Sequence, residues 1–256
     1  MTQPEAGVRL TSDAGVATLE IDCPPLNVLD IQTLEEVLGA IGSLSADETK
    51  VLVLRGREGA FSAGLDVREY AGSSFTDLID RFHGIFRRLV SVDFPVVAVV
   101  DGYCLGAGLE LVSVCDFTIA SDDSVLGQPE IGLGLFPPVA TIVLPRLIGI
   151  APANELILTG RRVSAAEAWD MGLIWRSVAR EDLEQEAQNL ISSLTRNSGS
   201  VLRLAKRAMY GRFRMRFMEE LAELESLYQN ELIRLEDTAE GLAAFLEKRK
   251  PVWKDC

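Results

Sequence analysis

Residues 96–110 read VVAVVDGYCLGAGLE, and this stretch decides the fold class of the chain. Its opening valine-rich run has no polar residue, as in a short strand that is buried on both faces. Gly102, Gly106 and Gly108 follow at once, and apolar residues then continue as a helix from about Gly106 to Val114. A strand, a glycine-rich turn and a helix in this order predict an α/β fold, with a sheet flanked by helices.

Elements of the same kinds precede and follow this stretch. Apolar residues alternate with polar ones, or run unbroken, in segments of strand length, and they recur at helical spacing in longer segments. Strands are predicted at 8–10, 16–21, 51–54 and 117–120, and amphipathic helices from the N-cap Asp30 onward and over 75–89. The first two strands flank a Ser-Asp-Ala-Gly turn and form a hairpin. Strands and helices therefore alternate through the first half of the chain.

Strand signals nearly vanish after about residue 145. Ser164 and Glu167 have the spacing of a capping box, Gly172 suits a helix C-terminus, and residues 181–247 are rich in Glu, Leu and Arg. We expect several helices here that pack on the core or assemble subunits. The predicted division is a core over residues 1–195 and a helical assembly region over residues 196–256.

The charge of the chain excludes some partners. With 38 acidic and 25 basic residues the net charge is −13, so nucleic acid is a poor ligand. No basic N-terminal segment precedes an apolar run, and no apolar stretch approaches the roughly 20 residues of a membrane span. We expect a cytoplasmic protein without membrane contact.

The sequence also argues against a metal site and against catalysis by histidine. Four scattered cysteines without C-x-x-C spacing and a single histidine do not form a zinc set, so no metal is expected. His83 lies in an amphipathic helix, and no G-x-S-x-G motif offers it a nucleophile. We expect His83 to be a surface or boundary residue.

Two glycine-rich turns follow strands, at residues 61–66 (FSAGLD) and 102–108. The second runs into a helix, whose free N–H groups can bind developing negative charge. Neither a dinucleotide-binding G-x-G-x-x-G nor a P-loop is present.

Glu110 and Glu130 stand in largely apolar settings, as general acid/base catalysis requires. From spacing alone, the alternative stays open that Glu110 is a helix N-terminal acid and Glu130 a loop charge.

Six segments in order give the chain a resemblance to the enoyl-CoA hydratase/isomerase (crotonase) superfamily over essentially its whole length. They are 24–29 (PPLNVL), 61–67 (FSAGLDV), 101–110 with Cys115-Asp116, 127–130 (GQPE), 158–162 (LTGRR) with Ser164-Ala165, and 245–250 (FLEKRK). The resemblance implies a crotonase-like core of repeated ββα turns with two roughly perpendicular sheets. It also implies a C-terminal helical trimerisation region, and a homotrimer or a hexamer built as a dimer of trimers.

The same resemblance assigns roles in hydration. The backbone N–H groups of Leu65 and Ala107 correspond to the oxyanion hole for a thioester carbonyl, and each such donor is worth roughly 3 kcal/mol. Glu110 and Glu130 occupy the two positions that hydratases of this family use together to add water. The implied substrate is an acyl-CoA, with no cofactor beyond its CoA moiety.

The resemblance also implies a CoA site. Ala63 and Val67 correspond to the adenine pocket, where Gly64 permits close approach, and Arg68 corresponds to a contact with the CoA phosphates. Lys248, from a neighbouring subunit, is implied as a second phosphate contact. A few basic groups at the mouth of a pocket suffice to hold an anionic ligand on an acidic protein.

One segment departs from ordinary enoyl-CoA hydratases. Phe136, Pro137 and Pro138 replace a glycine-rich stretch, and proline has no N–H to offer to water. This segment resembles cyclohexa-1,5-diene-1-carbonyl-CoA hydratases of anaerobic aromatic degradation (the benzoyl-CoA pathway), and we expect it to form an apolar wall for a ring. General 2-enoyl-CoA hydration, double-bond isomerisation, thioester hydrolysis and a non-catalytic CoA-binding scaffold stay open as alternatives.

Overall fold

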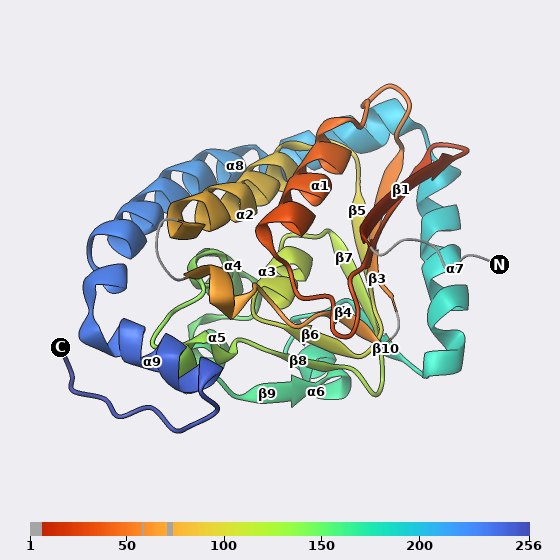
Figure 1. Cartoon of the computed structure of the whole chain (residues 1–256). Helices are drawn as coiled ribbons and strands as arrows, with labels where there is room; N and C mark the ends of the chain where they lie inside the picture. The colour runs from red at the N-terminus through yellow and green to blue at the C-terminus, as the bar shows by residue number, and fades with distance from the viewer. Residues whose placement is uncertain (1–6, 58, 71–73) are drawn as a thin grey trace.

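A computed structural model describes residues 7–57, 59–70 and 74–256 of the chain (Figure 1). Its larger sheet has six strands in the order β1-β2-β3-β5-β7-β10. Only the β1–β2 hairpin is antiparallel among these pairs. The strands are β1 (Gly7–Asp13), β2 (Val16–Asp22), β3 (Val51–Gly56), β5 (Val96–Val100), β7 (Phe117–Ser121) and β10 (Arg176–Val178). The hairpin and the buried strands predicted from the sequence are confirmed.

A second sheet has four short strands in the order β4-β6-β8-β9. They are β4 (Ala60–Ser62), β6 (Tyr103–Leu105), β8 (Val125–Gly127) and β9 (Arg162–Ser164). β4, β6 and β8 each follow a strand of the larger sheet after a short turn, and their directions differ from those of the long strands (Figure 1). Strand, short strand and helix therefore repeat along the chain, as the resemblance implied.

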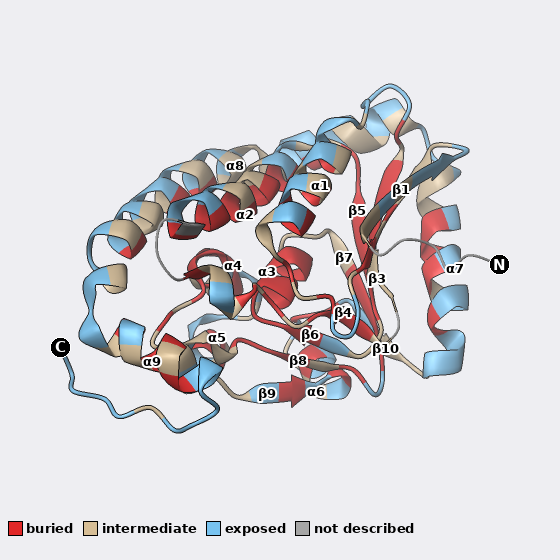
Figure 2. Cartoon of the chain, in the orientation of Figure 1, coloured by how far each residue is buried: buried red, intermediate tan, exposed pale blue. Residues whose placement is uncertain are grey.

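Helices cover both faces of the larger sheet. Val51 and Val53 of β3 pack against α7 (Leu183–Thr195), whereas Leu52 and Leu54 face the main core. α7 therefore buries one side of the sheet, and its outer side is exposed (Figure 2). The opposite side is covered by α1 (Ile31–Gly42), α2 (Ser74–Ser91), α3 (Ala107–Ser113) and α4 (Pro138–Leu147). Burial on both faces explains the unbroken apolar run of β3.

After α4, the chain is helical except for the short strands β9 and β10. This region comprises α5 (Ile150–Thr159), α6 (Ala165–Asp170), α7, α8 (Gly199–Asn230) and α9 (Glu236–Leu246), with the single-turn helices η3 (Arg180–Asp182) and η4 (Leu232–Arg234). α8 packs on α2 and α4, and its Phe217 and Leu221 are buried. The helical region is thus in close contact with the core. The division at residues 195 and 196 stays a prediction.

Local helix signals in the sequence behave as expected. The Asp30 carboxylate accepts the N–H of Thr33 at 2.8 Å and begins α1, and Ser164 accepts the N–H of Glu167 at 3.2 Å and begins α6. Gly172 follows the end of α6 with φ of +80°. Within the described ranges, no helix has both the length and the apolar character needed to cross a membrane. The same residues contain no cluster of three metal-ligating side chains.

Candidate active site

A cavity of about 860 Å³ lies between the two glycine-rich turns, α2 and the C-terminal helices. Leu65 and Ala107 line it, and so do Glu110 and Glu130. These four residues come from separate parts of the chain, and the fold brings them to one space. The alternative interpretation, in which the two glutamates are unrelated charges, does not account for this arrangement.

The first glycine-rich turn is held against the segment before α1. Ala63 N–H donates to Leu26 at 2.9 Å, and Leu29 N–H donates to Gly64 at 2.9 Å. Gly64 has φ of +105°, and a Cβ there would lie 3.7 Å from the backbone nitrogen of Ala107. The two turns therefore meet at this point. The N–H groups of Leu65 and Ala107 have no backbone acceptor among the described residues.

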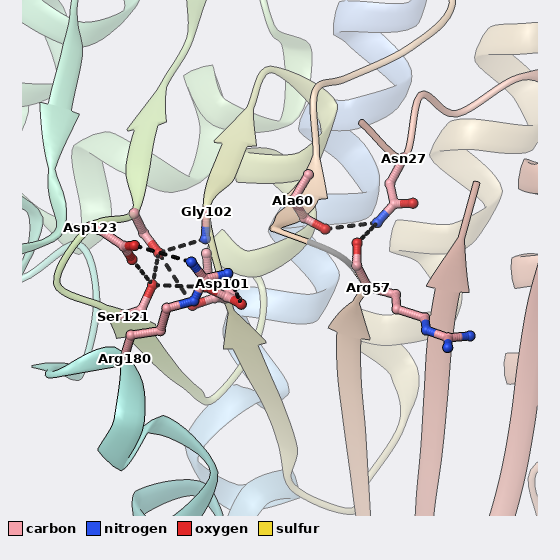
Figure 3. Close-up of polar contacts among 10 residues, drawn as sticks. Asn27, Arg57, Ala60, Asp101, Gly102, Ser121, Asp123 and Arg180 are labelled. Atoms are coloured by element: carbon pink, nitrogen blue, oxygen red, sulfur yellow. Dashed lines mark hydrogen bonds and ion pairs between the residues drawn. The ribbon is translucent and has the colours of Figure 1, made fainter. Parts of the chain in front are cut away.

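Asn27 fixes the segment that holds this first turn (Figure 3). Its side-chain oxygen accepts the N–H of Cys23 at 2.8 Å, and its amide group donates to the carbonyls of Ala60 at 2.7 Å and Arg57 at 3.2 Å. The side chain is buried, and the backbone of Asn27 has φ of +51°. Asparagine tolerates this left-handed conformation better than most residues do. One side chain thus ties three segments together beneath Gly64 and Leu65.

A second polar network fixes the other turn (Figure 3). Ser124 Oγ accepts the N–H of Gly102 at 3.0 Å and interacts with Ser121 Oγ at 2.7 Å. Arg180 pairs with Asp101 at 2.8 Å and reaches Asp123 at 3.5 Å. The turn between β7 and β8, together with Arg180, therefore holds the start of the turn that leads to Ala107.

Glu110 is buried, and its carboxylate faces the N-terminus of α4. Its Oε1 atom accepts the N–H groups of Val139 at 2.8 Å and Ala140 at 3.0 Å. Pro138, the first residue of α4, has no N–H, so the next two amides are those that meet the carboxylate. Burial raises the pKa of Glu110 to about 7, although the two amide donors oppose this rise.

Glu130 lies on the single-turn helix η2 (Pro129–Leu133). Gln128, which is fully buried, donates from its side-chain nitrogen to both carboxylate oxygens at 3.1 and 3.2 Å, in the amide orientation that satisfies its neighbours. Gly106 leaves room for this carboxylate, because a Cβ there would lie 2.6 Å from Oε1. Burial, and then repulsion from Glu110, raises the pKa of Glu130 well above its usual range.

Aromatic and apolar side chains form the wall beside the glutamates. Phe136 and Tyr228 meet edge to face with ring centroids 5.1 Å apart, and both line the cavity. Pro138 lines it as well, whereas Pro137 precedes α4 and does not. Two of the three predicted pocket residues therefore lie at the cavity. No local pattern in the sequence points to Tyr228, because it comes from α8, far along the chain.

The predicted CoA-binding residues gather at the same cavity, with one exception. Ala63, Gly64, Val67 and Arg68 line it, and Arg162, which we did not predict, joins them. The guanidinium of Arg68 is largely exposed and is held by the Asp66 carboxylate, with Nε 2.9 Å from Oδ1. Lys248 lies just beyond α9 and does not line the cavity. Its assigned role concerns another subunit and stays a prediction.

The expectation that His83 lies at the surface or a boundary is wrong. Its side chain is fully buried and lines the cavity, and Nδ1 lies 2.8 Å from Oε1 of Glu225 on α8. α2 is enclosed here because α8 packs along it. Spacing could have revealed this position, since His83 follows Ile79 by one helical turn on the apolar face.

Comparisons with known proteins agree with the geometry. The model of the family described as Enoyl-CoA hydratase/isomerase matches residues 11–256. A probable enoyl-CoA hydratase, echA8 of Mycobacterium leprae, is 39% identical over 88% of this chain and 89% of its own. The cyclohexa-1,5-dienecarbonyl-CoA hydratase of Thauera aromatica is 34% identical over 97% and 96%.

The fold has close counterparts among solved structures. An enoyl-CoA hydratase from Mycobacterium avium subsp. paratuberculosis K-10 superimposes with a TM-score of 0.88 at 26% identity, and the match covers 98% of this chain and 100% of the other. Sequence and structure comparisons thus identify a hydro-lyase with the mixed α/β crotonase fold. The chain belongs to the enoyl-CoA hydratase/isomerase family.

Proposed function

We propose that the enzyme adds water to a conjugated acyl-CoA, with Glu110 as general base and Glu130 as general acid. The observation that carries this proposal is the shared cavity, where both carboxyl groups lie with the N–H groups of Leu65 and Ala107. Burial raises the pKa of both carboxyl groups, but two amide donors limit the rise for Glu110 to about 7, whereas repulsion from Glu110 raises the pKa of Glu130 further. Glu110 is therefore the first to ionise, and Glu130 keeps its proton.

The addition of water then takes place with two proton transfers. The Glu110 carboxylate takes a proton from water as the water oxygen bonds to the unsaturated carbon β to the thioester carbonyl. The displaced electron pair moves onto the thioester oxygen as an enolate, which the N–H groups of Leu65 and Ala107 stabilise. Glu130 returns a proton to carbon. Net addition of water leaves one carboxylate and one carboxylic acid, with the proton exchanged between them.

We propose cyclohexa-1,5-diene-1-carbonyl-CoA as the substrate and 6-hydroxycyclohex-1-ene-1-carbonyl-CoA as the product. A rigid wall of Phe136, Pro138 and Tyr228 suits a flat ring, and the Thauera aromatica relative carries this activity in its name. With this diene the enolate is conjugated with the second double bond, and Glu130 delivers its proton to the far carbon of that bond. The second candidate is general 2-enoyl-CoA hydration, which the Mycobacterium leprae relative favours.

Parallel assays of the purified protein with cyclohexa-1,5-diene-1-carbonyl-CoA and crotonyl-CoA separate these candidates. A higher kcat/KM for the ring supports the proposal, and a higher value for crotonyl-CoA replaces it with general hydration. Water labelled with oxygen-18 must appear in the product; isomerisation leaves the product unlabelled. Release of free CoA would reveal hydrolysis, and binding without turnover of either compound would indicate a scaffold.

We also propose a homotrimer or a hexamer that needs no cofactor beyond the CoA moiety. Several apolar side chains of α8 are exposed on the single chain, including Val201, Met209 and Met215. Such side chains are typical of a surface that a second subunit covers. Sedimentation equilibrium should give three or six times 28.0 kDa. Activity should survive dialysis against a metal chelator.

A further inference from the structure

Arg162 brings a positive charge to the cavity that the hydration mechanism does not use. Among the described residues, the basic side chains that line the cavity are Arg68, His83 and Arg162. Arg68 pairs with Asp66, and His83 contacts Glu225. The side chain of Arg162 makes no ion pair and no hydrogen bond within the described part of the chain. Its guanidinium is therefore available to a ligand.

The smaller sheet directs the side chain of Arg162 to the cavity. Arg162 of β9 is the register partner of Gly127 of β8, which is in turn the partner of Leu105 of β6. Register partners in neighbouring strands point to the same face of a sheet, and Leu105 also lines the cavity. A Cβ on Gly127 would lie 3.2 Å from Cγ of Arg162, so the glycine leaves room for the arginine stem.

Arg162 stands at the mouth of the cavity rather than in its depth. It is exposed, as is Tyr103, which also lines the cavity, whereas Glu110 is buried. A thioester whose acyl group reaches the two carboxyl groups has its carrier extending toward the mouth. A negative charge on the ligand is disfavoured beside carboxylates and favoured beside a guanidinium. The anionic part of a ligand therefore belongs on the side of Arg162.

We propose that Arg162 binds a phosphate group of the CoA moiety and is the main electrostatic contact of the carrier, a role that the family resemblance gives to Arg68. The Arg68 guanidinium holds the pKa of the Asp66 carboxyl below its usual range, so this pair has little net charge to offer. A planar guanidinium can donate to two phosphate oxygens at once. The inference rests on the proposed acyl-CoA function and names the residue that selects the carrier.

Binding of saturated thioesters tests this without any turnover. The probes are butyryl-CoA, butyryl-dephospho-CoA, which lacks the 3′-phosphate, and S-butyrylpantetheine, which lacks every phosphate. In isothermal titration calorimetry, Arg162→Gln should bind butyryl-CoA about tenfold or more weakly than wild type, the order expected for a lost hydrogen bond between charged groups. It should bind S-butyrylpantetheine as wild type does. A penalty that vanishes with butyryl-dephospho-CoA assigns the contact to the 3′-phosphate, and one that persists assigns it to the pyrophosphate.

Matched variants separate a specific contact from a general effect of charge. Arg196→Gln removes the same charge from an exposed arginine that does not line the cavity, and it should change neither affinity. Arg162→Lys keeps the charge without the planar fork and should retain part of the affinity. Arg68→Gln should weaken butyryl-CoA less than Arg162→Gln does, and a larger loss would overturn the proposal. An equal loss of S-butyrylpantetheine in Arg162→Gln would also overturn it.

Salt dependence gives a second measurement if S-butyrylpantetheine binds too weakly for a ratio. Added salt screens charge pairs, so it should weaken butyryl-CoA binding to wild type more than to Arg162→Gln. Equal salt dependence refutes the contact.

Failure of this inference differs from failure of the proposed function. A wild-type protein that binds none of the three thioesters would refute the acyl-CoA function itself. Tight binding of butyryl-CoA that is equal in wild type, Arg196→Gln and folded Arg162→Gln would leave that function standing and refute only the role of Arg162.

Discussion

The backbone nitrogen of Val139 lies 2.8 Å from Oε1 of Glu110, so the first turn of α4 holds the carboxylate of α3. The partial positive charge of a helix N-terminus favours the ionised form. Desolvation disfavours the ionised form and outweighs the amides, so the pKa of Glu110 rises to about 7. A carboxylate in this balance can both take a proton and release it near neutral pH, which is what a general base needs.

Replacement of Glu110 tests its role as the base. Glu110→Gln should lower kcat by about 10² to 10⁴, the range typical of a lost general base, with a much smaller change in KM. The exposed Glu181→Gln is a control that alters charge far from the cavity. Steady-state assays with circular dichroism check the result. Wild-type turnover in folded Glu110→Gln would exclude Glu110 from the chemistry.

The pH dependence of kcat/KM should have a bell shape. The rate should fall with decreasing pH below about 7, because Glu110 becomes protonated and can no longer accept a proton. It should fall again at high pH, because Glu130, whose pKa is raised well above its usual range, loses the proton that it donates. The acidic limb should disappear from the residual activity of Glu110→Gln. A profile that is flat from pH 5 to 9 would contradict these assignments.

The same pKa shift predicts how stability varies with pH. A carboxyl group whose pKa is higher in the folded state binds its proton more tightly there, so it stabilises the fold at low pH. This contribution is complete below pH 4.5, the pKa of the glutamate in the unfolded chain, and is lost as the pH rises to about 7, its pKa in the folded protein. The free energy of unfolding of wild type should therefore fall relative to Glu110→Gln across that window. Urea titrations at pH 4.5 and 7.5 measure the difference, and an opposite sign would disprove the shift.

Gly106 should be intolerant of a side chain. In Gly106→Ala, the Cβ would lie 2.6 Å from Glu130 Oε1. The alanine would also have to adopt a positive φ of 54°, which disfavours residues with a side chain. We expect kcat to fall at least about tenfold, because small displacements of a catalytic group are costly. Gly132→Ala is the matched control, since nothing lies within 4 Å of its Cβ. Equal activities of the two variants would show that Glu130 is free to move.

Asn27 should matter for stability. Asn27→Ala removes three hydrogen bonds, leaves buried backbone groups unpaired and places alanine at φ of +51°. The free energy of unfolding should drop by about 2–4 kcal/mol. Activity should fall as well, since the turn that carries Leu65 rests on this segment. Chemical denaturation and assays below the unfolding transition check both effects. A loss under 1 kcal/mol would mean that solvent replaces the side chain.

The sequence predicted the fold class for local reasons, whereas the gathering of Glu110 and Glu130 was expected only from the family resemblance. A valine-rich strand, glycine turns and helix caps each depend on neighbouring residues, and the family resemblance supplied the rest. Three-residue strands such as β6 have too few positions for a period to appear. His83 was misplaced because its burial depends on α8, more than a hundred residues away. Local spacing indicates the face of α2 on which His83 lies, but not which distant element covers that face.

Tyr228 and Glu225 show that α8 completes the cavity. Tyr228 lies in the cavity wall beside Phe136 and Glu225 contacts the ring of His83 on α2, whereas both glutamates of the proposed chemistry precede residue 131. Tyr228 and the two glutamates of the proposed chemistry therefore come from different stretches of the polypeptide, although both border one cavity. Mutations confined to the final helices could retune which acyl groups are accepted while the proton-transfer apparatus is inherited unchanged.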